Sequence, residues 1–181
     1  MTALFLLLMS AAAAVPATAD QHDSRLKSLF DALKTASSPA KASYAEMIIW
    51  QIWSDSGDPA LDQLLREGSD AMAKDDYPTA LKKFSALVEK KPDFAEGWNR
   101  RATLYYLMGD YKASIADIDR VLELEPRHFG ALAGLGLINI QLDREEAAKD
   151  AFERVLEVYP LNASAKANLE FVKKKLDEKS I

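Results

Sequence analysis

The sequence predicts an all-α protein, an α-solenoid of stacked helix pairs, on the basis of three observations. Three similar segments, LVEKKP, VLELEP and VLEVYP, end at Pro92, Pro126 and Pro160, so the chain has a period of 34 residues. Within each period, apolar residues recur at spacings of three and four, which is the pattern of amphipathic helices. The composition, 49% hydrophobic and 28% charged over 181 residues, is typical of a globular protein with one core.

The repeat divides the centre of the chain into three units with equivalent positions. Some of these positions hold small residues, where two helices can approach closely, and others hold apolar residues of a second helix. The units are residues 61–94, 95–128 and 129–162. The small positions are Gly68, Ala102 and Gly136, then Ala80, Ser114 and Ala148; the apolar positions are Phe84, Ile118 and Phe152, then Leu87, Val121 and Val155.

The second unit, AEGWNRRATLYYLMGDYKASIADIDRVLELEP, has the strongest pattern. Trp98, Arg101, Ala102 and Tyr105 fall on one face of a helix, and Gly109 is placed to end that helix. This unit resembles a tetratricopeptide repeat, a pair of antiparallel helices. The resemblance implies three such pairs whose first helices line a concave groove. It also implies that the groove recognises a peptide or another protein.

A closer resemblance involves the segments IWQIWSDSGDPALDQLL and EPRHFGALAGLG as well. Together with the second unit, they are similar to short exported tetratricopeptide proteins of alphaproteobacterial cell envelopes. This resemblance implies a periplasmic role in envelope maintenance, as a scaffold or adaptor without assigned chemistry.

Helices are also expected on both sides of the repeats. Residues 20–60 are predicted to form an N-terminal helical hairpin, because two apolar stripes, one around Leu29 and one around Ile48, are separated by Ser-Ser-Pro. We expect this hairpin to cap the first repeat. Trp50 is expected in its core, and the alternative is an exposed Trp50 that binds a ligand. Residues 163–181 are predicted to form a C-terminal capping helix with one apolar face and one face rich in lysine and glutamate.

Residues 1–19 are predicted to be a signal peptide cleaved after Ala19. An apolar run from Leu4 to Val15 precedes small residues and the first charge at Asp20. The run is too short to span a bilayer as a helix, so no stable membrane span is expected after cleavage. The predicted location is therefore periplasmic or secreted. No lysine or arginine precedes the run, which leaves open a late-assigned start, or an uncleaved apolar helix on a cytosolic adaptor or co-chaperone.

Composition and motifs argue against catalysis and against nucleic-acid binding. The net charge is −5, whereas a protein that binds nucleic acid needs a basic face. There is no cysteine, and His22 and His128 do not form a spaced metal pair; His128 is expected to be a solvated turn residue. Gly134 and Gly136 lack the third glycine and the strand of a nucleotide loop, and Asp117 is interpreted as surface charge. We expect no enzyme activity, metal or cofactor; an enzyme with unrecognised surface groups is a third alternative.

The groove-facing positions of the first helices form the candidate binding site. Chaperone-binding members of the family grip a C-terminal carboxylate with Lys, Asn and Arg from three repeats. Here the third repeat offers Ala133 and Gly134 instead, so an Hsp90-type co-chaperone is not expected. The alternative is that these residues contact only neighbouring helices and water. The sequence specifies neither the protein or peptide partner nor an oligomeric state. The predicted groove residues are Arg66, Ser69, Met72, Asn99, Arg100, Thr103, Tyr106, Leu107, Leu137 and Gln141.

One repeat position that is usually apolar in the family holds charges in this chain. It is Glu67 in the first unit, Arg101 in the second and Leu135 in the third. Equivalent positions on successive first helices are neighbours in the stack. We therefore predict a partly buried ion pair between Glu67 and Arg101.

Overall fold

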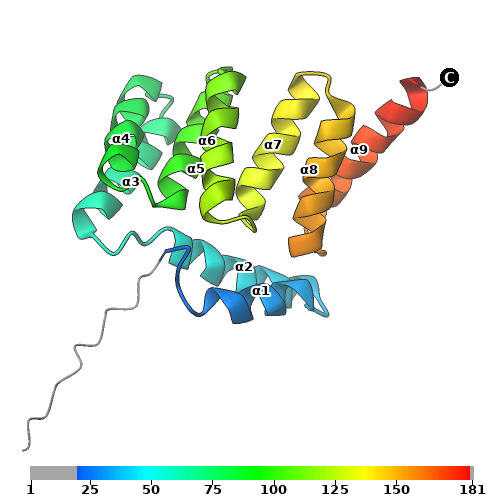
Figure 1. Cartoon of the computed structure of the whole chain (residues 1–181), viewed down its shortest axis with the longest axis horizontal. Helices are drawn as coiled ribbons and strands as arrows, with labels where there is room; N and C mark the ends of the chain where they lie inside the picture. The colour runs from blue at the N-terminus through cyan, green and yellow to red at the C-terminus, as the bar shows by residue number, and fades with distance from the viewer. Residues whose placement is uncertain (1–19, 180–181) are drawn as a thin grey trace, which may run out of the picture.

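The computed structural model describes residues 20–179, and over this range the protein consists of α-helices with no strand. The predicted all-α solenoid is confirmed (Figure 1). The predicted signal peptide, residues 1–19, lies outside the described residues. In chain order the helices are α1 (Leu26–Lys34), α2 (Pro39–Trp53), α3 (Pro59–Ala73), α4 (Tyr77–Lys90), α5 (Ala95–Leu107), α6 (Tyr111–Leu124), α7 (Phe129–Gln141), α8 (Glu145–Val158) and α9 (Ala163–Lys179).

Three helix pairs, α3/α4, α5/α6 and α7/α8, stand side by side and form the repeat stack (Figure 1). Asp76 and Asp110 begin α4 and α6, because their carboxylates accept hydrogen bonds from backbone N–H groups of the first turn. The turn between the two helices of each pair contains one residue with positive φ, namely Asp75 at 58°, Gly109 at 77° and Asp143 at 52°. The same local geometry is therefore built in each repeat.

Within each pair, the two helices approach closely where a small residue faces a bulky one. A Cβ atom on Gly136 would lie 2.6 Å from Cζ of Phe152, which is far too close for van der Waals contact. In the second repeat Ala102 takes the place of the glycine, and the facing position holds the slimmer Ile118. The first repeat has a glycine and phenylalanine pair again. The sizes of the two residues are thus matched repeat by repeat.

We expect Gly136→Ala to lower the free energy of unfolding by about 1–2 kcal/mol, because the cost of overpacking exceeds the gain in helix propensity. Urea denaturation followed by circular dichroism measures this change. Adding Phe152→Ile copies the second repeat and should recover part of the loss. A Gly136→Ala protein that is at least as stable as the wild type would contradict the close approach.

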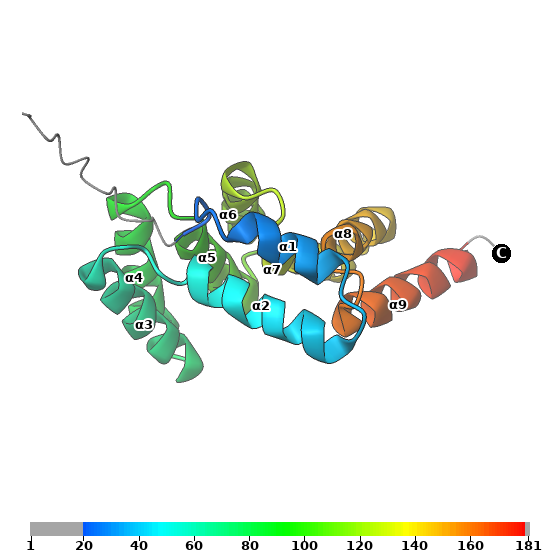
Figure 2. The same ribbon diagram turned by 90° about the horizontal axis from the view of Figure 1, so that it is seen from below.

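The N-terminal hairpin, α1 and α2, does not cap the first repeat, so this expectation from the sequence is wrong. The hairpin lies beneath the stack and crosses it (Figures 1 and 2). Its buried Leu33, Ile49 and Trp53 share one apolar core with Phe129 of α7 and Phe152 of α8. The hairpin therefore packs on the third repeat.

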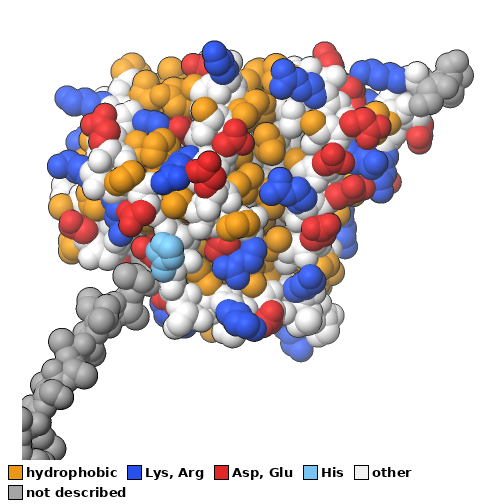
Figure 3. Space-filling view, viewed as in Figure 1, with side chains coloured by type: hydrophobic (Ala, Val, Ile, Leu, Met, Phe, Trp, Pro, Cys, Tyr) orange, Lys and Arg blue, Asp and Glu red, His pale blue; other side chains and the backbone are white. Residues whose placement is uncertain are grey.

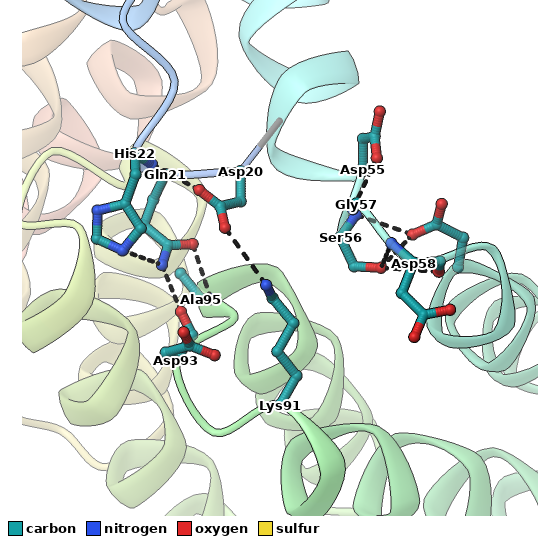
Figure 4. A network of polar contacts seen from close by, with 11 residues as sticks. Asp20, Gln21, His22, Asp55, Ser56, Gly57, Asp58, Lys91, Asp93 and Ala95 are labelled. Atoms are coloured by element: carbon teal, nitrogen blue, oxygen red, sulfur yellow. Dashed lines mark hydrogen bonds and ion pairs between the residues drawn. The ribbon is translucent and has the colours of Figure 1, made fainter. Parts of the chain in front are cut away.

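The segment before α1, from Asp20, and the hairpin α1/α2 together form an N-terminal layer. This layer contacts three equivalent turns, each of which follows the second helix of a repeat. At residues 91–95, the Gln21 side chain donates a hydrogen bond to the Asp93 carbonyl and accepts one from the Ala95 N–H (Figure 4). At the next turn, the Arg127 guanidinium lies 4.1 Å from the centre of the Phe30 ring. At the third, the Tyr159 hydroxyl donates to the Glu46 carboxylate at 3.1 Å. Segments near the N-terminus therefore contact three successive turns of the stack, which lie far from them in sequence.

Gln21 supplies a cap that α5 lacks. The residue that precedes α5 is Phe94, whose side chain cannot accept a hydrogen bond, and no side-chain cap is present there. At the equivalent positions, His128 and Asn162 accept hydrogen bonds from the first turns of α7 and α9. The orphan N–H of Ala95 is instead satisfied by Gln21, 74 residues away in sequence.

The first repeat needs no apolar cap because the outward face of α3 is polar. Gln63, Glu67 and Asp70 are spaced as neighbours on one face of this helix, and Gln63 Nε2 donates to Glu67 Oε1 at 2.7 Å. A polar outer face is what a terminal repeat needs for solubility. At the other end of the stack, α9 packs on α8 and buries Ala165, Leu169 and Val172.

The face formed by α4, α6 and α8 has a charged surface of mixed sign. Lysine and arginine side chains lie beside aspartate and glutamate side chains across it (Figure 3). The first helices, α3, α5 and α7, which carry the predicted groove residues, lie on the other side of the stack (Figure 2).

Candidate peptide-binding groove

A cavity of about 290 Å³ lies between the first helices of the second and third repeats. One wall is α5, the other is α7, and α6 contributes the floor. No lysine, arginine, aspartate or glutamate is among its lining residues. These residues are Asn99, Ala102, Thr103, Tyr106, Leu107, Ser114, Ile118, Gly130, Ala131, Ala133, Gly134, Leu137 and Ile138.

Five of the ten predicted groove residues line this cavity: Asn99, Thr103, Tyr106, Leu107 and Leu137. The hollow exists because α7, FGALAGLGLINIQ, places glycine and alanine opposite the larger side chains of α5. The character of the groove changes across it. The second repeat contributes the polar Asn99 and Thr103, and the equivalent positions of the third repeat are apolar, Ala133 and Leu137.

The other predicted groove residues lie elsewhere. Arg66 and Gln141 are exposed outside the cavity. The Ser69 hydroxyl donates a hydrogen bond to the Leu65 carbonyl of its own helix at 2.8 Å. Met72 packs against the core of the first repeat. Arg100 lines a second hollow that adjoins the cavity. The structure thus concentrates the candidate site in the second and third repeats.

This second hollow, of about 400 Å³, includes a residue of the N-terminal hairpin. It is lined by Trp50, Asn99, Arg100, Thr103 and Gly130. A Cβ atom on Gly130 would lie 2.7 Å from Cη2 of Trp50, so glycine at this position lets the indole reach the base of the groove. Both sequence interpretations of Trp50 hold in part, because the indole is partly buried against the apolar core and also lines this hollow. Its position depends on how the hairpin docks, for which the periodicity gives no signal.

A buried polar cluster underlies the groove. The Glu96 carboxylate is fully buried and accepts hydrogen bonds from Arg100 Nε at 2.5 Å and Asn99 Nδ2 at 2.9 Å. His128 Nε2 lies 3.3 Å from the same carboxylate, and His128 Nδ1 accepts a hydrogen bond from the Ala131 N–H at 3.1 Å. Because Nδ1 accepts, Nε2 carries the hydrogen that points to Glu96. The cluster fixes the orientation of both Asn99 and Arg100.

His128 is not the solvated turn residue that the sequence predicts. Its side chain is fully buried and stacks on the indole of Trp53 with a centroid distance of 4.1 Å. The hairpin covers the turn that contains this histidine, and sequence periodicity does not reveal that cover. His128 therefore links the hairpin to the groove through Glu96.

The surroundings of Glu96 stabilise its charged form. Burial alone would raise the pKa of this carboxyl group, but the hydrogen bonds from His128 and Asn99 and the charge of Arg100 together hold the pKa below its ordinary value of 4.5. Glu96 is thus a carboxylate in the folded protein at neutral pH.

Because the pKa of Glu96 is lower in the folded state than in the unfolded state, its contribution to stability is present in full above pH 4.5. We expect this contribution to be lost as the pH falls below 4.5 towards the lowered pKa. The free energy of unfolding, measured by urea denaturation at a series of pH values, should fall less steeply with acid for Glu96→Gln than for the wild type. Parallel curves for the two proteins below pH 4.5 would contradict this prediction.

The predicted ion pair between Glu67 and Arg101 is wrong, because each residue pairs within its own repeat. Glu67 Oε2 lies 2.5 Å from Lys83 Nζ, and Arg101 forms two hydrogen bonds to Asp117, at 2.7 and 2.9 Å. Both pairs join residues 16 positions apart, from the first helix to the second. The interpretation of Asp117 as surface charge is also wrong, since the residue is buried.

Between residues 20 and 179, no helix is both long and apolar enough to cross a membrane. Over the same range, no group of three or more His, Cys, Asp or Glu residues is placed to hold a metal ion. The site consists of an apolar hollow, a few hydrogen-bonding side chains held by Glu96, and the indole of Trp50.

Comparison with known proteins identifies the family. Two family models, both described as tetratricopeptide repeat, match residues 95–128 and residues 129–160 respectively. A TPR repeat-containing protein of Rhizobium etli is 39% identical over 152 residues, which cover 84% of this chain and 74% of that protein. The chain belongs to the tetratricopeptide-repeat (TPR) family. It resembles alphaproteobacterial TPR proteins.

Similarity to other TPR proteins is more distant. One relative is the small glutamine-rich tetratricopeptide repeat-containing protein 2 of Saccharomyces cerevisiae, with 26% identity over 119 residues. The matched segment covers 65% of this chain but only 34% of the yeast protein. The crystal structure of the Sgt2 TPR domain from Aspergillus fumigatus matches 68% of this chain and 83% of that domain, with 26% identity and a TM-score of 0.64. The first TPR of RPAP3, solved bound to an HSP90 peptide, matches 65% of this chain and 93% of that domain, with 22% identity and a TM-score of 0.63, and shows the shared fold.

Proposed function

We propose that this TPR protein is a non-catalytic adaptor that holds a segment of a partner protein in the cavity between α5 and α7. The cavity itself carries the proposal. It is an apolar hollow of about 290 Å³ on the groove side of the stack, flanked by hydrogen-bonding side chains whose orientation is fixed by Glu96. Concave, mostly apolar sites with a few placed polar groups are typical binding sites. The RPAP3 domain, which has the same fold, holds a peptide.

The proposed location is the periplasm of a bacterium. The apolar run, the small residues before Asp20 and the similarity to an alphaproteobacterial protein support it. The alternative is a cytosolic adaptor, which the fold shared with domains solved with HSP90 and HSP70 peptides supports. Sequencing the N-terminus of the native protein separates the two: Asp20 supports export, and an intact Met1 overturns it.

The function is tested by crosslinking the purified protein in envelope and cytosolic extracts of the bacterium that produces it. Thr103→Glu/Leu107→Glu places two charges at exposed positions that line the cavity. The matched control is Phe171→Glu on α9, since Phe171 and Leu107 are similarly exposed, at 47% and 48%. We expect a partner that crosslinks to the wild type and the control and is lost in the double variant. A partner retained by the double variant would exclude the cavity as the binding site.

A further inference from the structure

We infer that the groove recognises an internal, uncharged stretch of its partner, with one apolar side chain in the cavity, and does not read a C-terminal carboxylate. The inference rests on the proposed function and names the class of ligand. It follows from the pairing of Arg100 with Glu96 and from the absence of charged residues in the cavity lining.

The cation at the groove is already paired. Arg100 Nε donates to the Glu96 carboxylate at 2.5 Å, and this carboxylate has no exposed surface. A carboxylate brought by a ligand would meet an arginine whose charge is offset at short range, and would also be repelled by Glu96. The electrostatic gain that a terminal carboxylate could obtain at Arg100 is therefore small.

The third repeat offers no replacement for this cation. The positions equivalent to Asn99, Arg100 and Thr103 are Ala133, Gly134 and Leu137, and no charged side chain lines the cavity. Burying an unpaired carboxylate against such a lining is costly, whereas burying an apolar side chain is favourable. The cavity therefore selects for an apolar side chain.

The remaining polar groups suit a peptide backbone. Within residues 20–179, the outer nitrogens of Arg100 have no hydrogen-bond partner and can donate to a carbonyl. Thr103 donates its hydroxyl hydrogen to the Asn99 carbonyl at 2.9 Å, so its oxygen can accept from an N–H group. Trp50 adds an apolar wall beside these groups. A neutral main chain with an apolar side chain satisfies all of them.

A peptide library distinguishes the two kinds of ligand. Peptides of about nine residues, about 30 Å long when extended, are synthesised in pairs that differ only in a free or an amidated C-terminus. Each carries an N-terminal fluorophore, and binding to the purified protein is measured by fluorescence anisotropy. For the peptides that bind, we expect the two forms to differ in Kd by less than about threefold. Replacing their central apolar residue with aspartate should weaken binding by about tenfold or more.

A variant sharpens the test. Glu96→Gln removes the charge that neutralises Arg100, so this variant should prefer the free carboxylate over the amide, once circular dichroism shows that it is folded. Wild-type protein that binds the free acid about tenfold tighter than the amide would overturn the inference and leave the adaptor function standing. Failure of every peptide to bind in both forms would overturn the proposed function together with the inference.

Discussion

Arg101→Ala is expected to lower the free energy of unfolding by about 3 kcal/mol, because it leaves the Asp117 carboxylate buried without its cation. The side chains of Arg101 and Asp117 are only 16% and 7% exposed, and two hydrogen bonds join them. The guanidinium also lies 4.9 Å from the centre of the Trp98 ring, a contact that the alanine variant loses. Urea denaturation followed by circular dichroism measures the change.

The third repeat provides the control for this experiment. Its equivalent positions are Leu135 and Ala151, so the double variant Arg101→Leu/Asp117→Ala copies a pair that the fold already contains. We expect this double variant to lie within about 1 kcal/mol of the wild type, since replacing a buried ion pair with apolar residues is often neutral or stabilising. If Arg101→Ala costs no more than an exposed substitution, about 0.5 kcal/mol, the pair is not a stabilising contact.

Trp53→Ala should destabilise the protein by about 3–5 kcal/mol, the cost of truncating a large, fully buried aromatic residue. Trp53 is 1% exposed and stacks on His128, and it packs against Phe30 and Phe129 at centroid distances of 5.8 and 5.1 Å. Its loss removes the stacking contact between the hairpin and His128, in the turn before α7. Thermal and urea denaturation should both show the effect.

Tyr44→Ala is the matched control for Trp53→Ala, because Tyr44 is an aromatic residue on the same helix and is 65% exposed. We expect it to change stability by less than about 0.5 kcal/mol. Equal losses for the two variants would mean that the hairpin is not held through Trp53.

The repeat stack was predictable because its contacts are local and recur. The 34-residue period and the spacing of three and four residues define the helices, and five predicted groove residues, such as Thr103 and Leu137, line the cavity. The partners of Glu67 and Arg101 could also have been predicted from the sequence. Sixteen residues after Glu67 the chain has the oppositely charged Lys83, and sixteen residues after Arg101 it has the oppositely charged Asp117. At the same distance from the apolar Leu135 it has the apolar Ala151.

The docking of the hairpin was not predictable from periodicity. An apolar stripe shows that a helix buries one face, but it does not show which surface covers it. The buried state of His128 and the place of Trp50 in the groove both follow from this docking. Gln21 is a similar case, since it caps a helix that begins 74 residues later. Such contacts between distant segments leave no regular pattern in the sequence.

A repeat array in which each unit touches only its neighbours can lose its end units one at a time. In this protein the N-terminal layer holds three successive turns, at Asp93, Arg127 and Tyr159. Because all three turns would lose these contacts together if the layer detached, local unfolding at one turn is expected to accompany local unfolding at the others. We therefore expect the second and third repeats to unfold as one cooperative unit, and this unit contains α5 and α7, the two walls of the cavity.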